Sequence, residues 1–136
     1  MSPARLLRRL RTDDSGGAVT WWLIGMAGVS ILLFALVGDG SRVMAGLNET
    51  SDVAQVAARA GARYVDPSSG TLDATRAEAA ALAEVTAAGM TGLVTVSGAE
   101  ITVTVSRTID LPLLAIVGAG EHTVTSTRAS RALTGP

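Results

Sequence analysis

The chain has 136 residues, a net charge of -1 and no cysteine, which excludes disulfides and thiolate metal sites. A long apolar run near the start uses residues that cannot also build a soluble core, and Tyr64 is the only aromatic residue beyond that run. The basic residues at the start are too local to indicate nucleic-acid binding. We therefore expect a modest domain attached to a membrane-associated segment.

The first apolar run has the length and flanks of a transmembrane helix. Residues 1–17 contain four Arg and two Asp, which give +2, whereas the remainder of the chain sums to -3. Residues 18–38 carry no charge, and at about 1.5 Å per residue they make about 31 Å of helix, the thickness of a bilayer's hydrocarbon core. Trp21 and Trp22 lie at its first edge, where indole rings favour the headgroup region. The positive-inside rule predicts a cytoplasmic tail at 1–17 and an extracytoplasmic remainder.

Two other interpretations of residues 18–38 stay open. A buried helix of a soluble protein would normally be shorter and would have partner helices of similar apolarity. A cleavable signal peptide usually has an apolar region of about 7–15 residues, which is shorter than this one. A weak cleavage site with small residues nevertheless exists around Ala35, just before Gly38. In that case the protein would be a secreted binding domain.

The helical pattern continues beyond the run and predicts a stalk at residues 39–65. Its apolar and small residues follow alternating steps of four and three, a heptad stripe suited to close packing against another helix or the chain's own head. The stripe consists of Val43, Leu47, Thr50, Ala54, Ala57, Gly61 and Tyr64. We expect Ala57 to face a partner, Ala58 to leave the stripe, and Asp39 to lie in water at the membrane surface. The turn residues 66–70 end the helix.

The pattern of residues 66–136 predicts a small extracytoplasmic α+β head. Asp73 is a plausible cap for a helix at 74–88. Alternating residues predict strands at 93–96 and 100–108, joined as a hairpin through Ser97, Gly98 and Ala99, and a third strand is predicted at 123–129. Residues 111–117 are apolar but too short to cross a bilayer.

Neither half of the chain contains a recognisable catalytic pattern. His122 beside Glu121 is the only histidine, and no companion completes a metal site or a triad, so a solvated turn is expected there. We expect no enzyme activity, cofactor or metal, and a membrane-tethered enzyme remains as an alternative that a hydrolase screen would reveal. Within the span, small residues on one face permit helix packing in lipid. These are Ala18, Gly25, Gly28 and Ala35.

Several segments, in their order along the chain, resemble the TadE/TadG-like proteins of tight-adherence (Flp-type) pilus assembly systems. The segments are Arg8 to Val19, Gly38 to Val43, Ala54 to Arg63, Ile101 to Ser106, Leu111 to Leu114, and the Thr-rich end up to Ala129. The resemblance implies a minor pilin-like or assembly component whose partners are the lipid bilayer and other pilus-assembly membrane proteins, with homo- or hetero-oligomers formed through helices.

The resemblance also raises the question of processing by a prepilin peptidase. Cleavage after Gly16 or Gly17 would place Trp21 or Trp22 at the position where related pilins commonly carry Glu. We therefore expect the chain to stay uncleaved in the membrane, as the TadG branch allows.

Overall fold

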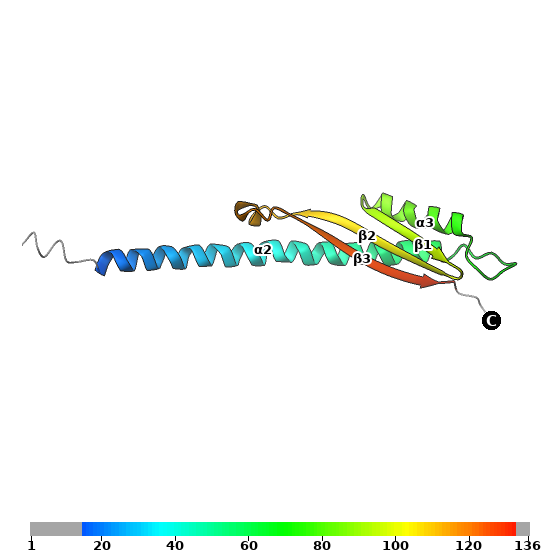
Figure 1. Cartoon of the computed structure of the whole chain (residues 1–136), viewed down its shortest axis with the longest axis horizontal. Helices are drawn as coiled ribbons and strands as arrows, with labels where there is room; N and C mark the ends of the chain where they lie inside the picture. Colours follow the sequence, from blue (N-terminus) through cyan, green and yellow to red (C-terminus); the bar gives the residue numbers. More distant parts are fainter. Residues whose placement is uncertain (1–14, 133–136) are drawn as a thin grey trace, which may run out of the picture. The chain divides into compact units, whose positions relative to one another are not determined.

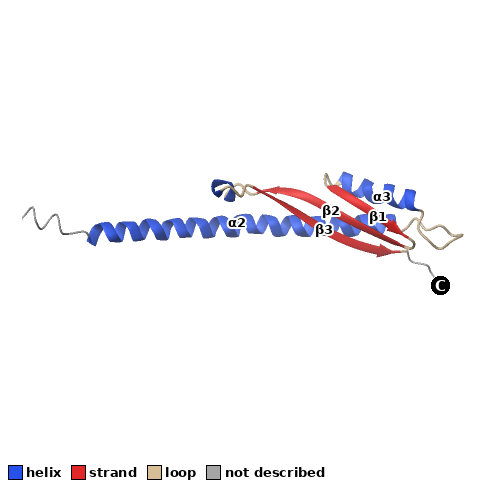
Figure 2. Ribbon diagram, viewed as in Figure 1, coloured by secondary structure: helices blue, strands red, loops and turns tan. Residues whose placement is uncertain are grey.

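The computed structural model describes residues 15–132. They form two α-helices, a three-stranded sheet and one short 3-10 helix (Figures 1 and 2). The chain divides into two compact units, which meet between Val37 and Gly38. The predicted α+β class, with one long apolar helix at the start, is confirmed. In chain order the elements are α2 (Ser15–Gly61), α3 (Ala74–Ala87), β1 (Thr91–Ser97), β2 (Glu100–Asp110), η1 (Leu114–Val117) and β3 (Glu121–Arg131).

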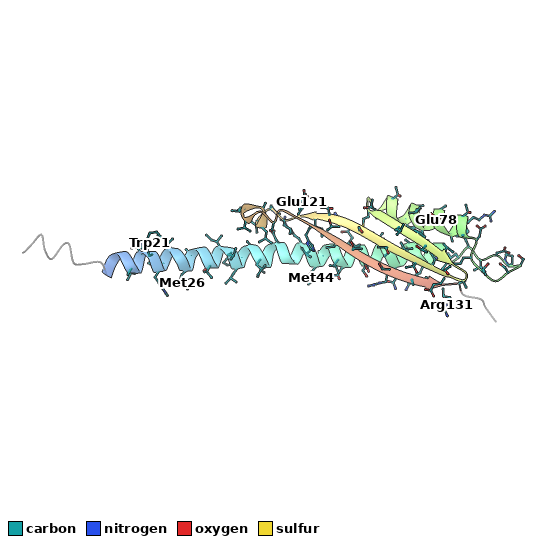
Figure 3. The ribbon with its side chains drawn as sticks, viewed as in Figure 1. Trp21, Met26, Met44, Glu78, Glu121 and Arg131 are labelled. Carbon is teal, nitrogen blue, oxygen red and sulfur yellow. The ribbon has the colours of Figure 1, made fainter. Side chains whose placement is uncertain are left out.

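The first unit contributes the apolar part of α2. Its most apolar 18-residue window has a mean hydropathy of 2.1, and only 6% of that window is buried. Trp21 and Met26 are among the side chains that project from this part of the helix (Figure 3). Within residues 15–132, α2 is the single helix with the length and apolar composition needed to cross a membrane, so it is a candidate span.

The second unit is built on an antiparallel sheet with strand order β1-β2-β3. Val103 lies opposite Val94 of β1 and Arg128 of β3, which fixes the register on both sides of the central strand. Gly98 has φ 60° in the turn between β1 and β2, a backbone conformation that glycine adopts without steric cost. The predicted hairpin is therefore present, and each strand is longer than its alternating pattern indicated.

The two faces of the sheet differ in chemistry, as expected for an antiparallel sheet covered on one side. On the inner face, β2 contributes Ile101, Val103 and Val105 to a core that also holds residues of both helices. On the outer face, hydroxyl pairs join β2 to β3, with Thr104 and Thr127 side-chain oxygens 3.0 Å apart and those of Ser106 and Thr125 3.1 Å apart. The helical residues of the core are Ala54, Ala57, Ala58, Ala77, Ala81 and Val85.

Two glycines allow the sheet and α3 to approach α2 closely. A Cβ added at Gly46 would collide with the side chain of Ile109. At Gly61 it would collide with Ile101 and would lie 2.8 Å from the backbone oxygen of Ala77. The missing side chains are therefore part of the packing surface, since interiors at native density leave no room for an extra methyl group.

Helix α2 ends at Gly61, four residues before the predicted end at 65. The chain then turns, and Val65 forms an isolated antiparallel bridge with Leu72. Asp66 holds this turn, because its Oδ1 accepts hydrogen bonds from the Ser68 hydroxyl and backbone N–H. These hydrogen bonds lower the pKa of the Asp66 carboxyl.

A pair of glycine substitutions on α2 tests this packing. Gly61→Ala should lower the free energy of unfolding by about 1–3 kcal/mol, because the new methyl group meets Ile101 and the Ala77 carbonyl. Gly40→Ala, where nothing lies within 4 Å of the added Cβ, should raise it by about 0.5–1 kcal/mol through helix propensity. Denaturant unfolding of the full chain in micelles measures both values. Equal effects of the two variants would contradict the close approach at Gly61.

Candidate functional site

Asp39 is buried at the start of the second unit, on the part of α2 that follows the apolar run. Its side chain is 0% exposed, and Oδ2 accepts a hydrogen bond from the backbone N–H of Leu114 at 2.7 Å. The other oxygen, Oδ1, has no hydrogen-bond partner among the described residues. The prediction of a solvated carboxylate at this position is therefore wrong. The sequence pattern could not reveal that a loop from the far end of the chain covers it.

That loop connects β2 to β3 and contains the 3-10 helix η1. The Leu113 side chain lies 3.3 Å from where a Cβ on Gly38 would be, so the loop sits against the first residues of the second unit. Leu111 donates its N–H to the Gly120 oxygen at 2.8 Å, which closes the base of the loop. Gly118 has φ 85° and ends η1. Asp39 therefore connects α2 to a folded loop, and this contact joins residues 75 positions apart.

The predicted stripe on α2 lies partly inside the second unit. Ala54, Ala57 and Gly61 are buried, and Val43 is half-buried. The expectation that Ala57 faces a partner is wrong, because the sheet and α3 share its core cluster. Ala58 was expected to leave the stripe, yet it is only 1% exposed. The packed face extends on both sides of Ala57 because two elements, β2 and α3, cover this stretch of helix.

Near the N-terminal end of the stripe, Gly46 is buried. Leu47, which was predicted to belong to the packed face, is 41% exposed. The sequence pattern favoured Leu47 because it is apolar, whereas the structure places glycine where Ile109 and Val124 approach. The residue buried at this point of α2 is therefore the one small enough to let the strands approach, and not the more apolar one.

The small residues of the candidate span all lie on α2. Ala18, Gly25 and Gly28 are exposed, and Ala35 is buried. The possible processing residues Gly16 and Gly17 lie in the first turn of α2, and nothing lies within 4 Å of a Cβ added to either. The Arg-rich tail at 1–14 lies outside the described residues. Processing and helix packing in lipid therefore stay predictions.

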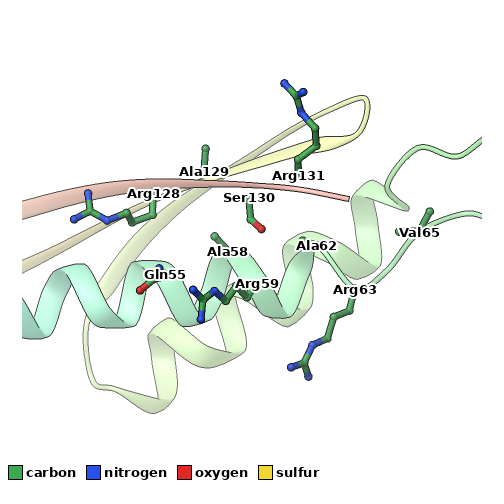
Figure 4. A pocket seen from close by; sticks show the side chains of 10 residues that line it. All are labelled: Gln55, Ala58, Arg59, Ala62, Arg63, Val65, Arg128, Ala129, Ser130 and Arg131. Atoms are coloured by element: carbon green, nitrogen blue, oxygen red, sulfur yellow. The ribbon is translucent and has the colours of Figure 1, made fainter. Parts of the chain in front are cut away.

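An open groove in the second unit is lined by the last turns of α2, by the residues that follow it and by β3 (Figure 4). Its volume is about 750 Å³. Alternation along β3 directs Arg128 and Ser130 toward α2, whereas Arg131 points away from the helix in Figure 4. The lining residues are Gln55, Ala58, Arg59, Ala62, Arg63, Val65, Arg128, Ala129, Ser130 and Arg131.

The groove combines small apolar side chains with arginines that differ in their partners. Arg131 forms an ion pair with Glu100 at 3.3 Å. Arg128 donates to the Ser51 hydroxyl at 2.6 Å and has no carboxylate partner among residues 15–132. The same part of the chain offers no ion pair to Arg59 or Arg63. Guanidinium groups in such a setting bind carboxylates well because their planar fork matches the two oxygens.

The groove was not predicted from the sequence. Arg59 and Arg63 are four positions apart in the sequence, which was a visible signal, but the register that brings Arg128 to the same place exists only in the folded sheet. His122, expected in a turn, instead lies on β3 opposite Ile109 and is exposed. Across the described residues no three His, Cys, Asp or Glu side chains gather as metal ligands do.

No protein-family model, curated protein or solved structure matches the chain at a significant level.

Removing the Asp39 carboxylate should loosen the β2–β3 loop. Asp39→Ala deletes a hydrogen bond to a charged group, worth about 1.5–3 kcal/mol, and should speed hydrogen exchange at the Leu114 amide by about tenfold or more. Asp39→Asn keeps an acceptor oxygen and should have a smaller effect. Asp52→Ala, at an exposed position of the same helix, is the control. Unchanged exchange at Leu114 in Asp39→Ala would contradict the assigned contact.

Proposed function

We propose that the chain is a single-pass membrane protein that serves as a structural component of a tight-adherence pilus or a related secretion system. Residues 18–38 are the anchor, and the rest of α2, up to Gly61, packs into the core of an extracytoplasmic head that the following residues complete. The protein acts by packing and presentation and not by catalysis. One observation carries the proposal: α2 leaves its apolar part uncovered, and its later part is built into the core of a folded unit.

The contrast along α2 supports a membrane anchor over a soluble core helix. A core helix buries its apolar side chains against neighbours, but only 6% of the most apolar window of α2 is buried. Further along, Ala54 and Ala57 are fully buried in the second unit. An uncovered apolar surface of this length is stable in lipid and unstable in water.

Anchoring and secretion differ in the fate of the apolar run. A cut before Gly38 would leave the core contacts of α2 in place, so the folded unit is compatible with both alternatives. The run exceeds the usual length of a signal-peptide apolar region, which favours retention. The four Arg that precede the uncharged run favour a cytoplasmic N-terminus. The pilus role itself is supported by the order of motifs that resemble TadE/TadG-like proteins.

The arginine-lined groove is the surface of the second unit best suited to a protein partner. The stripe on α2 is largely covered by the chain itself, so it is a poor docking site. The groove combines guanidinium groups with the small apolar side chains of Ala58 and Ala62. This chemistry fits an acidic segment of another assembly protein that carries small apolar residues between its carboxylates.

The membrane topology is tested with reporter fusions and intact mass. Alkaline phosphatase fused after Pro136 should be active and a cytoplasmic reporter at the same site inactive, because four Arg precede the span. The membrane fraction should contain the full chain of 13.8 kDa. The reverse reporter pattern would overturn the orientation. A product beginning near Gly38 would support secretion, and one beginning at Gly17 or Ala18 would show prepilin processing.

The groove is tested by binding of an oligoglutamate peptide with alanine spacers. Arg59→Ala and Arg128→Ala should each weaken binding by up to about fivefold, since exposed charge pairs contribute about 0–1 kcal/mol, and higher salt should weaken it further. Arg76→Ala is the matched control, because Arg76 lies on α3 outside the groove and pairs with Asp73. Equal losses in all three variants would indicate attraction to net charge alone and would reject the groove as the docking site.

A further inference from the structure

The β2–β3 loop displays three exposed apolar side chains within the five residues 113–117. Ile116 is 84% exposed and Val117 is 64% exposed, and Leu113 beside them is also exposed. Residues 111–120 carry no charge. Asp110 and Glu121 flank this charge-free segment and lie opposite each other in the sheet (Glu121 is labelled in Figure 3). The loop is therefore an apolar tip with a carboxylate pair at its base.

The position of the tip is set by contacts with the residues that end the apolar run. Leu114 donates its N–H to Asp39, and Leu113 approaches Gly38. Gly38 is the last residue of the uncharged segment 18–38. If that segment crosses the bilayer, Gly38 lies at the outer boundary of the hydrocarbon core, and the tip lies at the same boundary.

Several backbone groups of the tip have hydrogen-bond partners within the protein, which favours contact with a medium poor in water. Lipid-facing backbone groups need partners inside the protein because hydrocarbon provides none. Ala115 donates to the Leu111 oxygen at 2.9 Å, and Gly118 donates to the Ala115 oxygen at 3.1 Å. Ala119 donates to the Leu114 oxygen at 3.1 Å, and Pro112 has no N–H to satisfy. Exposed apolar side chains thus occur on a loop in which part of the polar backbone is paired within the protein.

We infer that the β2–β3 loop inserts its apolar tip into the outer leaflet of the membrane, as a lipid contact of the head in addition to the anchor. The inference rests on the proposed membrane span. Ile116 and Val117 enter the interfacial zone, and Asp110 and Glu121 stay in water above it. The Asp39–Leu114 hydrogen bond holds the tip at the level where the span ends. Two lipid contacts would restrict the rotation of the head relative to the membrane more than the anchor alone.

Fluorescence quenching with the full-length chain tests the depth of the tip. The chain has no native cysteine, so a single environment-sensitive label can be placed through Ile116→Cys. Vesicles of phosphatidylcholine and phosphatidylglycerol in a three-to-one ratio carry a nitroxide on the lipid chain near the headgroup. Phe34→Cys within the span is the positive control, and Thr125→Cys on the exposed face of β3 is the aqueous control.

We expect the label at Ile116 to be quenched several-fold more by the lipid nitroxide than the label at Thr125, and to be protected from aqueous iodide. In the Ile116→Asp background, a label placed through Val117→Cys should lose most of its lipid quenching, because a carboxylate resists entry into the membrane. Both side chains are exposed, so these changes leave the core intact.

The controls separate failure of this inference from failure of the proposed anchor. Lipid quenching at Phe34 together with aqueous behaviour at Ile116 would overturn the inserted tip and leave the anchor standing. Aqueous behaviour at Phe34 would overturn the proposed span, and the inserted tip with it. Equal quenching of Val117 labels with and without Ile116→Asp would also overturn the inference, because apolar contact would then not determine the depth.

Discussion

The close approach of the sheet to α2 is the constraint on which the folded unit depends. Its core has no aromatic side chain, so it is formed by Ile and Val of the strands packed against Ala and Gly of the helices. Dispersion contacts of that kind are strong only at short separation, and Gly46 and Gly61 provide the needed space. A helix face made of small residues therefore serves internal packing here. Such a face resembles a helix-docking seam in sequence, but it is already occupied.

The buried carboxylate of Asp39 extends the same constraint toward the candidate span. Burying an ionisable side chain is costly unless hydrogen bonds replace its lost hydration, and the Leu114 amide provides one of them. The contact fixes the β2–β3 loop against α2 although the loop is far away in sequence. The loop is consequently held against Gly38 and Asp39, which are the first residues of the folded unit.

The charged residues of the unit contribute little to its stability. Glu49 on α2 pairs with Arg107 on β2, and Arg131 pairs with Glu100, but both pairs are exposed and exposed pairs contribute little free energy. The first pair links β2 to α2, and the second links β3 to β2. The guanidinium of Arg128 instead donates a hydrogen bond to the Ser51 hydroxyl of α2. Polar contacts on this unit thus join strands to α2 and strands to one another.

The sequence by itself determined the apolar run, the second helix, the three strands and the turns at Asp66 and Gly98, because these depend on local periodicity and on backbone preference. Tertiary structure decided which face of α2 is covered, the burial of Asp39, and the meeting of Arg128 with Arg59 in one groove. Each of these depends on strand register and on a loop that returns to the helix from a distant part of the chain. Periodicity along one helix shows that a stripe exists, and only the packed sheet shows what covers it.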